Sequence, residues 1–168
     1  MRMVIKTPLG LAQIEEIDNK LVSLEFGKTA DVQCTSTEDL EQGLIHSPDS
    51  CLFGAAAQLI EYLAGRRRRF NVPLNPTGTP FQKRVWKELL SVPYGKTVSY
   101  KELADAAGCR HGARAVGYAM KSNPIPIFIP CHRVIRKDGS IGGYTGGPDK
   151  KRFLLSLEKH LFEPFPNS

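Results

Sequence analysis

Cys131 stands in the segment Pro130-Cys131-His132-Arg133, where a sulfur nucleophile adjoins a base and a permanent cation. A free cysteine has a pKa of about 8.5 and is mostly protonated at neutral pH, so a reactive cysteine needs help to lose its proton. His132 and Arg133 are the nearest candidates for that help. Further cations follow at Lys150-Lys151-Arg152, and Glu158 can orient a histidine as the third member of a nucleophile–base–orienter relay.

Residue types alone leave four interpretations of Cys131 open. It can be a buried structural cysteine, as most cysteines are. It can be a metal ligand, although Cys131 and His132 alone offer too few ligands. It can be the nucleophile of a hydrolase, which needs an oxyanion hole and a water that releases the acyl group. It can also be a stoichiometric acceptor that forms a stable thioether and is consumed, and sequence spacing does not separate these last two.

A glycine-rich tract from Gly139 to Gly147 follows the cysteine. The tract has no GK[ST] and does not fit the GxGxxG pattern at a strand-to-helix junction, so it does not indicate a phosphate loop. Glycine lets a backbone approach a ligand closely. The tract therefore predicts the wall of a pocket for a planar ligand, with Tyr144 and Thr145 in that wall.

The composition is that of an ordinary globular protein with excess positive charge. Hydrophobic residues make up 41% and charged residues 24% of the 168 positions, which allows one domain or two small ones. The net charge of +6 favours an anionic partner, with nucleic acid as the first candidate. No apolar run approaches the ~20 residues that span a bilayer, so we expect no membrane association.

The cysteines also indicate a compartment. Cys34, Cys51, Cys109 and Cys131 form no CxxC pair, which removes the signature of zinc-finger and thioredoxin sites. The N-terminal residues contain no signal-peptide core. We therefore expect reduced thiols in a cytoplasmic, nucleoid-associated or nuclear protein that is not secreted.

Residues 1–75 predict a small domain of strands and one helix. Apolar or alternating runs at 3–5, 11–17 and 21–26 predict strands, separated by turn residues at 8–10 and 18–19. Residues 28–50 are polar and aperiodic, which predicts a loop. Residues 51–64 predict a helix that ends before Gly65, with an apolar face formed by Leu52, Ala56, Leu59, Ile60 and Leu63. Prolines between 73 and 80 mark the boundary with a second domain, 76–168.

The second domain begins with three predicted helices. Thr79 caps the first, Pro80 is at its first position, and its apolar face carries Phe81, Val85, Leu89 and Leu90. Ser99 and Glu102 form a capping box for the second, which ends at Gly108. The third, residues 112–121, is rich in small residues, which lets it lie close to another backbone, including that of DNA.

A wing and a last helix complete this second domain. Asp138-Gly139 between apolar residues predicts a hairpin over residues 134–141. Apolar residues at helical spacing predict a final helix from Asp149 to Leu161. Three helices followed by a hairpin are typical of a winged helix-turn-helix. Arg114 argues against a fully buried third helix, because an unpaired arginine is costly to bury.

The segment from Thr79 to His160 resembles the O6-alkylguanine-DNA alkyltransferase family, the methylated-DNA–protein-cysteine methyltransferases. The segments that carry the resemblance are Thr79-Pro80-Phe81-Gln82, Val92-Pro93-Tyr94-Gly95, Val98-Ser99-Tyr100, Arg114-Ala115-Val116-Gly117, Asn123-Pro124, Pro130-Cys131-His132-Arg133-Val134 and Gly142-Gly143-Tyr144-Thr145-Gly146-Gly147. Residues 1 to about 75 match the family only in length and layout. The resemblance implies an α+β fold, with a small N-terminal β-sheet and helix domain of RNase H-like type before a winged helix-turn-helix catalytic domain.

The resemblance also implies a function. An alkyl group would pass irreversibly from O6-methylguanine in double-stranded DNA, and less efficiently from O4-methylthymine, to Cys131. Each molecule would act once, as a monomer and without a cofactor. The alternative is a helix-turn-helix DNA-binding regulatory module that transfers no alkyl group.

Roles for individual residues follow from the same resemblance. His132 would take the proton of Cys131 through a water, with Glu158 orienting the histidine and Lys151 close to the sulfur. Asn123 would be a hinge that fixes the active-site loop by backbone hydrogen bonds. Tyr100 would donate to N3 of the base or reposition the target phosphate.

The remaining implied roles concern DNA and the damaged base. Arg114 would fill the space that a flipped nucleotide leaves in the stack. Further DNA contacts are implied for Ser99, Tyr100, Ala113 and Gly117, and a base pocket for Met120, Val134, Tyr144 and Thr145.

Two features depart from the family pattern. Some members have an N-terminal zinc site, but Cys34 and Cys51 lack a matching set of partners here, so we expect no metal. Tyr118 occupies a position beside the face of the third helix where small residues are usual. Its side chain either alters the tolerance for bulky adducts or points into the core.

Overall fold

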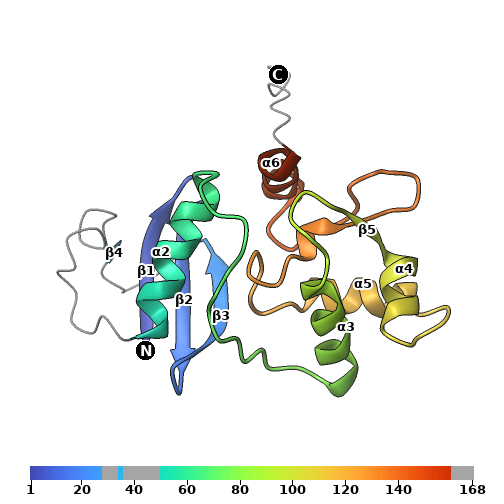
Figure 1. Cartoon of the computed structure of the whole chain (residues 1–168), viewed down its shortest axis with the longest axis horizontal. Helices are drawn as coiled ribbons and strands as arrows, with labels where there is room; N and C mark the ends of the chain where they lie inside the picture. The colour runs from blue at the N-terminus through green and yellow to red at the C-terminus, as the bar shows by residue number, and fades with distance from the viewer. Residues whose placement is uncertain (28–33, 36–49, 160–168) are drawn as a thin grey trace.

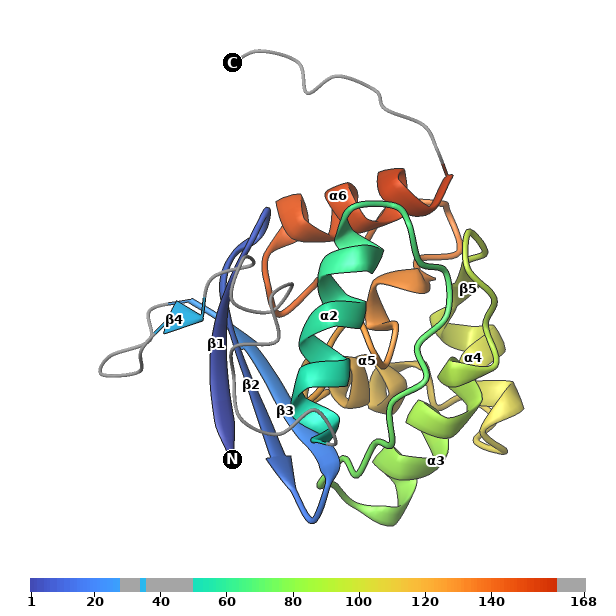
Figure 2. The same cartoon turned by 60° about the vertical axis from the view of Figure 1, so that its left-hand side comes forward.

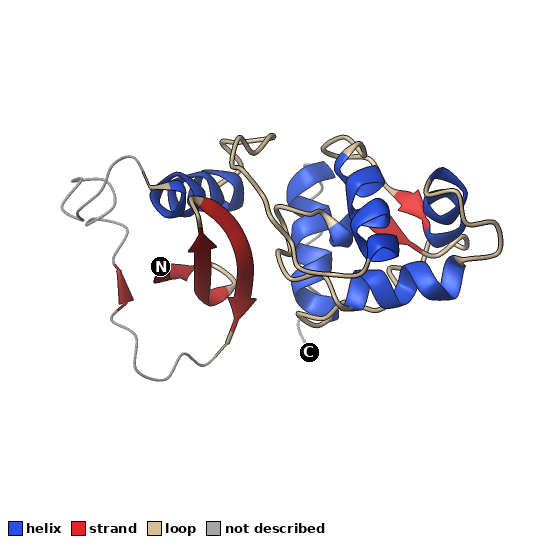
Figure 3. Ribbon diagram, turned by 90° about the horizontal axis from the view of Figure 1, so that it is seen from below, coloured by secondary structure: helices blue, strands red, loops and turns tan. Residues whose placement is uncertain are grey.

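The computed structural model describes residues 1–27, 34–35 and 50–159. An N-terminal half with a sheet and one helix lies beside a C-terminal half made mostly of helices (Figures 1 and 3). This is the mixed α and β architecture that the sequence predicts.

The N-terminal sheet is a three-stranded meander with one short added strand. Strands β1 (Arg2–Thr7), β2 (Gly10–Ile17) and β3 (Lys20–Phe26) form where strands are predicted, and β2 pairs antiparallel with both of the others. Asp18 and Asn19 both have positive φ, 51° and 55°, the conformation that suits a two-residue hairpin turn. Strand β4 (Cys34–Thr35) pairs in parallel with β1, so the loop prediction for 28–50 is wrong at these two residues. Residues 28–33 and 36–49 lie outside the described residues.

Helix α2 (Cys51–Leu63) packs on one face of this sheet, along β1, β2 and β3 (Figure 2). The hydroxyl of Ser50 accepts from the N–H of Leu52 and caps the first turn. Helix α2 ends before Gly65, as predicted. Gly65 has φ 73° and donates its N–H to the carbonyl of Tyr62. Ile60 is only half-buried, whereas the unpredicted Tyr62 is fully buried.

The three helices of the C-terminal half begin where their capping residues predict. Helix α3 (Pro80–Leu90) has a complete capping box from Thr79 and Gln82, and α4 (Tyr100–Ala106) has one from Ser99 and Glu102. Helix α5 (Ala113–Lys121) packs against both of them. The predicted face of α3 is wrong at Leu90, which is 49% exposed, because Trp86 takes the buried position instead.

The predicted hairpin after the third helix does not form. Strand β6 (Val134–Ile135) pairs in parallel with β5 (Val98–Ser99), and residues 140–141 form no strand. The carboxylate of Asp138 accepts hydrogen bonds from the N–H and the hydroxyl of Ser140, which closes a local turn in place of a strand ladder. The last helix, α6 (Pro148–Lys159), forms as predicted, although its predicted end at Leu161 lies outside the described residues.

The edge strand β3 joins the two halves of the protein. The N–H of Leu21 donates to the carbonyl of Pro73 at 2.9 Å, and the N–H of Leu24 donates to the carbonyl of Pro124 at 2.8 Å. These bonds cover an edge that would otherwise expose unpaired backbone groups. Buried apolar side chains of both halves form one core, which fixes α2 relative to the segment that carries Cys131. Among the described residues, no helix has the length and apolar character needed to cross a membrane.

Candidate active site

The backbone before Cys131 is held by the side chain of Asn123. Its amide nitrogen donates to the carbonyl of Ile129 at 2.9 Å, and its amide oxygen accepts from the N–H of Ile125 at 3.0 Å. Between them Ile127 has φ 73°, a left-handed conformation that costs about 1–3 kcal/mol for a β-branched residue. Burial of the Ile127 side chain, which is 1% exposed, and the clamp from Asn123 sustain that strain.

Cys131 begins the one-turn helix η1 (Cys131–Arg133), and its sulfur lies at a cavity of about 300 Å³. The residues that line this cavity are Tyr100, Gly117, Met120, Lys121, Cys131, Gly143, Tyr144 and Thr145. Burial raises the pKa of the Cys131 thiol, while Asn123 and the positive charge of Lys151 oppose that rise. The resting thiol is therefore protonated, and a base must remove its proton when it reacts.

His132, the residue after Cys131, forms a buried pair with Glu158. The Nε2 atom of His132 lies 2.8 Å from Oε1 of Glu158, and the two side chains are 0% and 1% exposed. Burial lowers the pKa of His132, which keeps the imidazole neutral at pH 7. Burial alone would raise the pKa of Glu158, but hydrogen bonds from His132 and Arg133 outweigh it and hold that pKa far below its ordinary value.

These protonation states select the tautomer of His132. An ionised carboxylate only accepts hydrogen bonds, so Nε2 carries the ring proton and donates a hydrogen bond to Glu158. The other nitrogen, Nδ1, then has a free lone pair. Nδ1 is buried and has no hydrogen-bond partner among the described residues. It is therefore the atom of this pair that can accept a proton.

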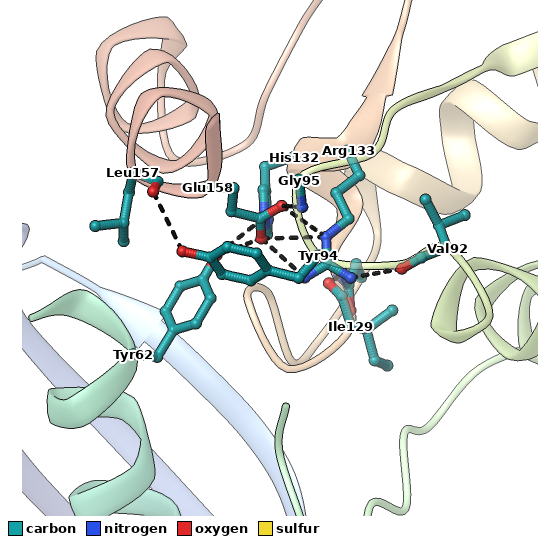
Figure 4. A network of polar contacts seen from close by, with 10 residues as sticks. Tyr62, Val92, Tyr94, Gly95, Ile129, His132, Arg133, Leu157 and Glu158 are labelled. Atoms are coloured by element: carbon teal, nitrogen blue, oxygen red, sulfur yellow. Dashed lines mark hydrogen bonds and ion pairs between the residues drawn. The ribbon is translucent and has the colours of Figure 1, made fainter. Parts of the chain in front are cut away.

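The Glu158 carboxylate collects donors from several segments (Figure 4). Nε of Arg133 donates to Oε2 at 3.0 Å, and Nη2 of Arg133 donates to Oε1 at 2.8 Å. The N–H of Gly95 donates to Oε2 at 2.9 Å, and the hydroxyl of Tyr62 donates to Oε1 at 2.6 Å. Buried carboxylates are tolerated only when paired and hydrogen-bonded in this way.

Sequence reasoning missed two of these partners and placed a third differently. Tyr62 is in another half of the molecule, and no local pattern connects it to Glu158. Arg133 was expected to shape the surroundings of the sulfur, but its guanidinium binds Glu158 and the carbonyl of Val92. Gly95 has φ 75°, and a Cβ there would lie 3.1 Å from the carbonyl oxygen of Glu158. The Pro93-Tyr94-Gly95 turn was the one available signal for this contact.

Lys151 is buried and hydrogen-bonded to Gly143, one of the residues that line the cavity. Its ammonium donates to the carbonyl of Val134 at 2.6 Å and to that of Gly143 at 3.3 Å. Burial lowers the pKa of Lys151 to about 8, although interaction with Cys131 opposes the shift. Val134 was expected in the pocket wall, but it is fully buried in β6 and is absent from the cavity lining.

The same cavity is lined by residues that are predicted to contact the base or to form the wall of its pocket. Tyr100, Met120, Tyr144 and Thr145 all line it, and the hydroxyl of Thr145 donates to the carbonyl of Lys121 at the end of α5. The Tyr144 hydroxyl is buried, and burial together with its interaction with Cys131 raises its pKa. It therefore stays protonated at the cavity wall.

Helix α5 presents the predicted DNA-contacting residues beside this cavity. Arg114 is exposed, whereas Ala113 and Gly117 are half-buried. Tyr118 is 68% exposed, so the interpretation that it points into the core is wrong. The hydroxyl of Ser99 accepts from the N–H of Glu102 and caps α4.

No group of three His, Cys, Asp or Glu side chains in the described ranges is placed to hold a metal ion.

Replacing Glu158 tests how much its carboxylate contributes to the stability of the fold. Glu158→Gln leaves the buried Arg133 guanidinium without its counter-charge, so we expect a loss of about 3–5 kcal/mol in the free energy of unfolding. Denaturant titration followed by circular dichroism measures it. Asp149→Asn is the matched control, because its ion pair with Arg152 is exposed. A similar small effect of both substitutions would contradict the role given to Glu158.

The same pair makes stability depend on pH. The unfolded chain protonates His132 near its ordinary pKa of 6.5 and Glu158 near 4.5, whereas the folded protein holds both pKa values lower. The unfolded state therefore binds more protons below about pH 6.5, and more again below about pH 4.5, so stability falls as the pH drops. Denaturant midpoints measured across this range should decline in those two steps. A midpoint that rises between neutral pH and pH 5 would rule this out.

Comparisons with known proteins agree with this geometry. Residues 1–76 match the ribonuclease-like domain of 6-O-methylguanine DNA methyltransferase, and residues 80–160 match its DNA-binding domain. The constitutive methylated-DNA–protein-cysteine methyltransferase of Bacillus subtilis is 41% identical over 155 residues, 92% of each chain. The Mycobacterium bovis protein of that name is 54% identical over 114 residues, covering 67% of this chain and 69% of its own.

Solved structures show the same similarity in three dimensions. Mycobacterium tuberculosis OGT in complex with DNA superposes with a TM-score of 0.79 at 41% identity, over 95% of this chain and 92% of its own. An O6-methylguanine DNA methyltransferase from Methanococcus jannaschii gives a TM-score of 0.66 at 26% identity, over 99% and 98%. From its sequence, its fold and the residues around Cys131, this chain belongs to the methylated-DNA–protein-cysteine methyltransferase family.

Proposed function

We propose that the protein repairs DNA by moving the alkyl group from O6 of a guanine to the sulfur of Cys131, once per molecule. In this reaction the bond between O6 and the alkyl carbon breaks, and a bond between that carbon and Sγ forms. The observation that carries the proposal is that Cys131 lines a base-sized cavity and is followed directly by His132, which is paired with Glu158 in the protein interior. Its relatives carry the corresponding activity in their names.

The proton of the thiol leaves through His132. Nδ1 has the free lone pair, so it accepts this proton through a bridging water, and Glu158 stabilises the imidazolium that forms. The nearby ammonium of Lys151 favours the thiolate electrostatically. The guanine that leaves needs its developing negative charge stabilised, and the Tyr100 hydroxyl at the cavity wall can donate to N3 of the base.

Single turnover follows from the bond that is formed. A hydrolase releases its acyl group because water attacks the carbonyl carbon of a thioester. A methyl thioether has no such carbonyl, so an activated water does not cleave it. His132 therefore needs to act only once, and the protein is consumed stoichiometrically.

The damaged base must leave the double helix to reach the sulfur. We assign this step to α5, where exposed Arg114 would fill the space left in the base stack while Ala113 and Gly117 let the helix approach the DNA. Ser99 at the start of α4 would contact the backbone. O4-methylthymine would react more slowly, since its single ring fills less of the cavity than guanine does.

The organisation of the whole chain fits this function. We propose separate domains at 1–75 and 76–168, supported by the hydrogen bonds of Leu21 to Pro73 and Asn75, which tie the connecting segment to the N-terminal sheet. We also propose that the protein acts as a monomer, without a cofactor, in the compartment that holds the DNA.

Stoichiometry tests the proposal. Wild-type protein incubated with excess duplex that contains O6-methylguanine should gain one methyl group in place of the thiol hydrogen, a net increase of one CH2 and no more, as read by intact-mass spectrometry. Cys131→Ala should abolish the gain yet still bind the lesion duplex. Turnover beyond one equivalent would favour a hydrolase. Sequence-selective binding of undamaged duplex with no mass gain would favour a helix-turn-helix regulator.

Arg114→Ala distinguishes an effect on base extrusion from an effect on alkyl transfer itself. Without a side chain to fill the stack, extrusion costs more, and we expect transfer from duplex DNA to slow about tenfold or more. Transfer from free O6-benzylguanine should stay at the wild-type rate, because no stack is disturbed. Arg152→Ala on α6 removes the same charge elsewhere and serves as the control. Equal slowing with both substrates would rule out the extrusion role.

A further inference from the structure

A buried hydroxyl from the N-terminal half reaches into the proton relay. We propose that Tyr62 of α2 is a positioning residue for the alkyl transfer, which sets the orientation and the basicity of His132 through Glu158. The N-terminal half thereby takes part in the reaction. This inference rests on the proposed function, because it concerns the rate of that transfer.

The contacts place Tyr62 at the junction of the relay (Figure 4). Its hydroxyl donates to Oε1 of Glu158 at 2.6 Å and lies 3.2 Å from Nε2 of His132. Oε1 is also the oxygen that His132 contacts at 2.8 Å. The hydroxyl and Nε2–H therefore share one acceptor atom, and each draws on the same negative charge.

The surroundings of Tyr62 fix the position of its ring and keep its hydroxyl protonated. Its side chain is fully buried, and its ring centroid lies 5.1 Å from that of Phe70, 6.0 Å from Tyr94 and 6.5 Å from His132. Burial, followed by the charge of Glu158, raises the pKa of the hydroxyl. The hydroxyl therefore stays protonated, and the carboxylate receives a permanent donor.

Removing the Tyr62 hydroxyl changes the basicity of His132. In Tyr62→Phe, Oε1 loses one hydrogen bond, so more of its negative charge acts on the imidazole. That charge favours imidazolium and raises the pKa of His132. Because protonated His132 cannot accept the thiol proton, the acid limb of the transfer rate should move to higher pH. Loss of the fixed carboxylate orientation should also lower the plateau rate several-fold.

The experiment measures single-turnover alkylation by free O6-benzylguanine from about pH 5 to about pH 9. For Tyr62→Phe we expect the acid limb to shift upward by about half a unit or more. Tyr94→Phe is the matched control: it loses a hydroxyl that donates to the carbonyl of Leu157 at 3.2 Å, in the same aromatic cluster but without a hydrogen bond to the carboxylate. Its acid limb should coincide with that of wild type, even if its thermal stability falls.

The outcomes separate this inference from the proposed function. If wild type is not alkylated at all, the proposed function fails. If wild type is alkylated and the profile of Tyr62→Phe superimposes on it, Tyr62 is only structural and the inference fails. Should Tyr62→Phe not fold, 3-fluorotyrosine at position 62 replaces it. Its more acidic hydroxyl donates more strongly, so the acid limb should move to lower pH, and an unmoved limb would overturn the inference.

Discussion

The rest of the site depends on one buried carboxylate. The side chain of Glu158 is 1% exposed, and without its donors its charge would be too costly to bury. Those donors come from α2, from the turn before β5 and from the two residues after Cys131. Satisfying one carboxylate therefore brings together segments that lie far apart in the sequence. The same bonds fix the imidazole with its free nitrogen available to accept a proton.

This arrangement reconciles the burial of the Cys131 thiol with the reactivity that we propose for it. Burial keeps Cys131 protonated at rest, which protects it from indiscriminate oxidation. His132 is kept neutral by burial, so it can act as a base at physiological pH. The hydrogen bonds of Asn123 hold the loop before Cys131 in a conformation that is strained at Ile127. Strain at such a position is typical of functional sites.

Local signals predicted much of the fold, because their causes are local. The capping boxes at Thr79 and Ser99 set the starts of α3 and α4 within a few residues. The hairpin failed because the pairing of β6 is decided by β5, about 36 residues earlier, and not by the turn beside it. The motif around Cys131 predicted the His132–Glu158 contact through family resemblance. Tyr62 was missed because its partners lie 70 and 96 residues away and no spacing rule reaches that far.

The central claim is that Cys131 is consumed as an alkyl acceptor. The most direct measurement is peptide mapping by mass spectrometry after reaction with duplex DNA that carries a labelled O6-methyl group. We expect the label on the peptide of Cys131 as a thioether, with the free thiols of Cys51 and Cys109 unmodified. Label released as methanol, or found on another cysteine, would contradict it.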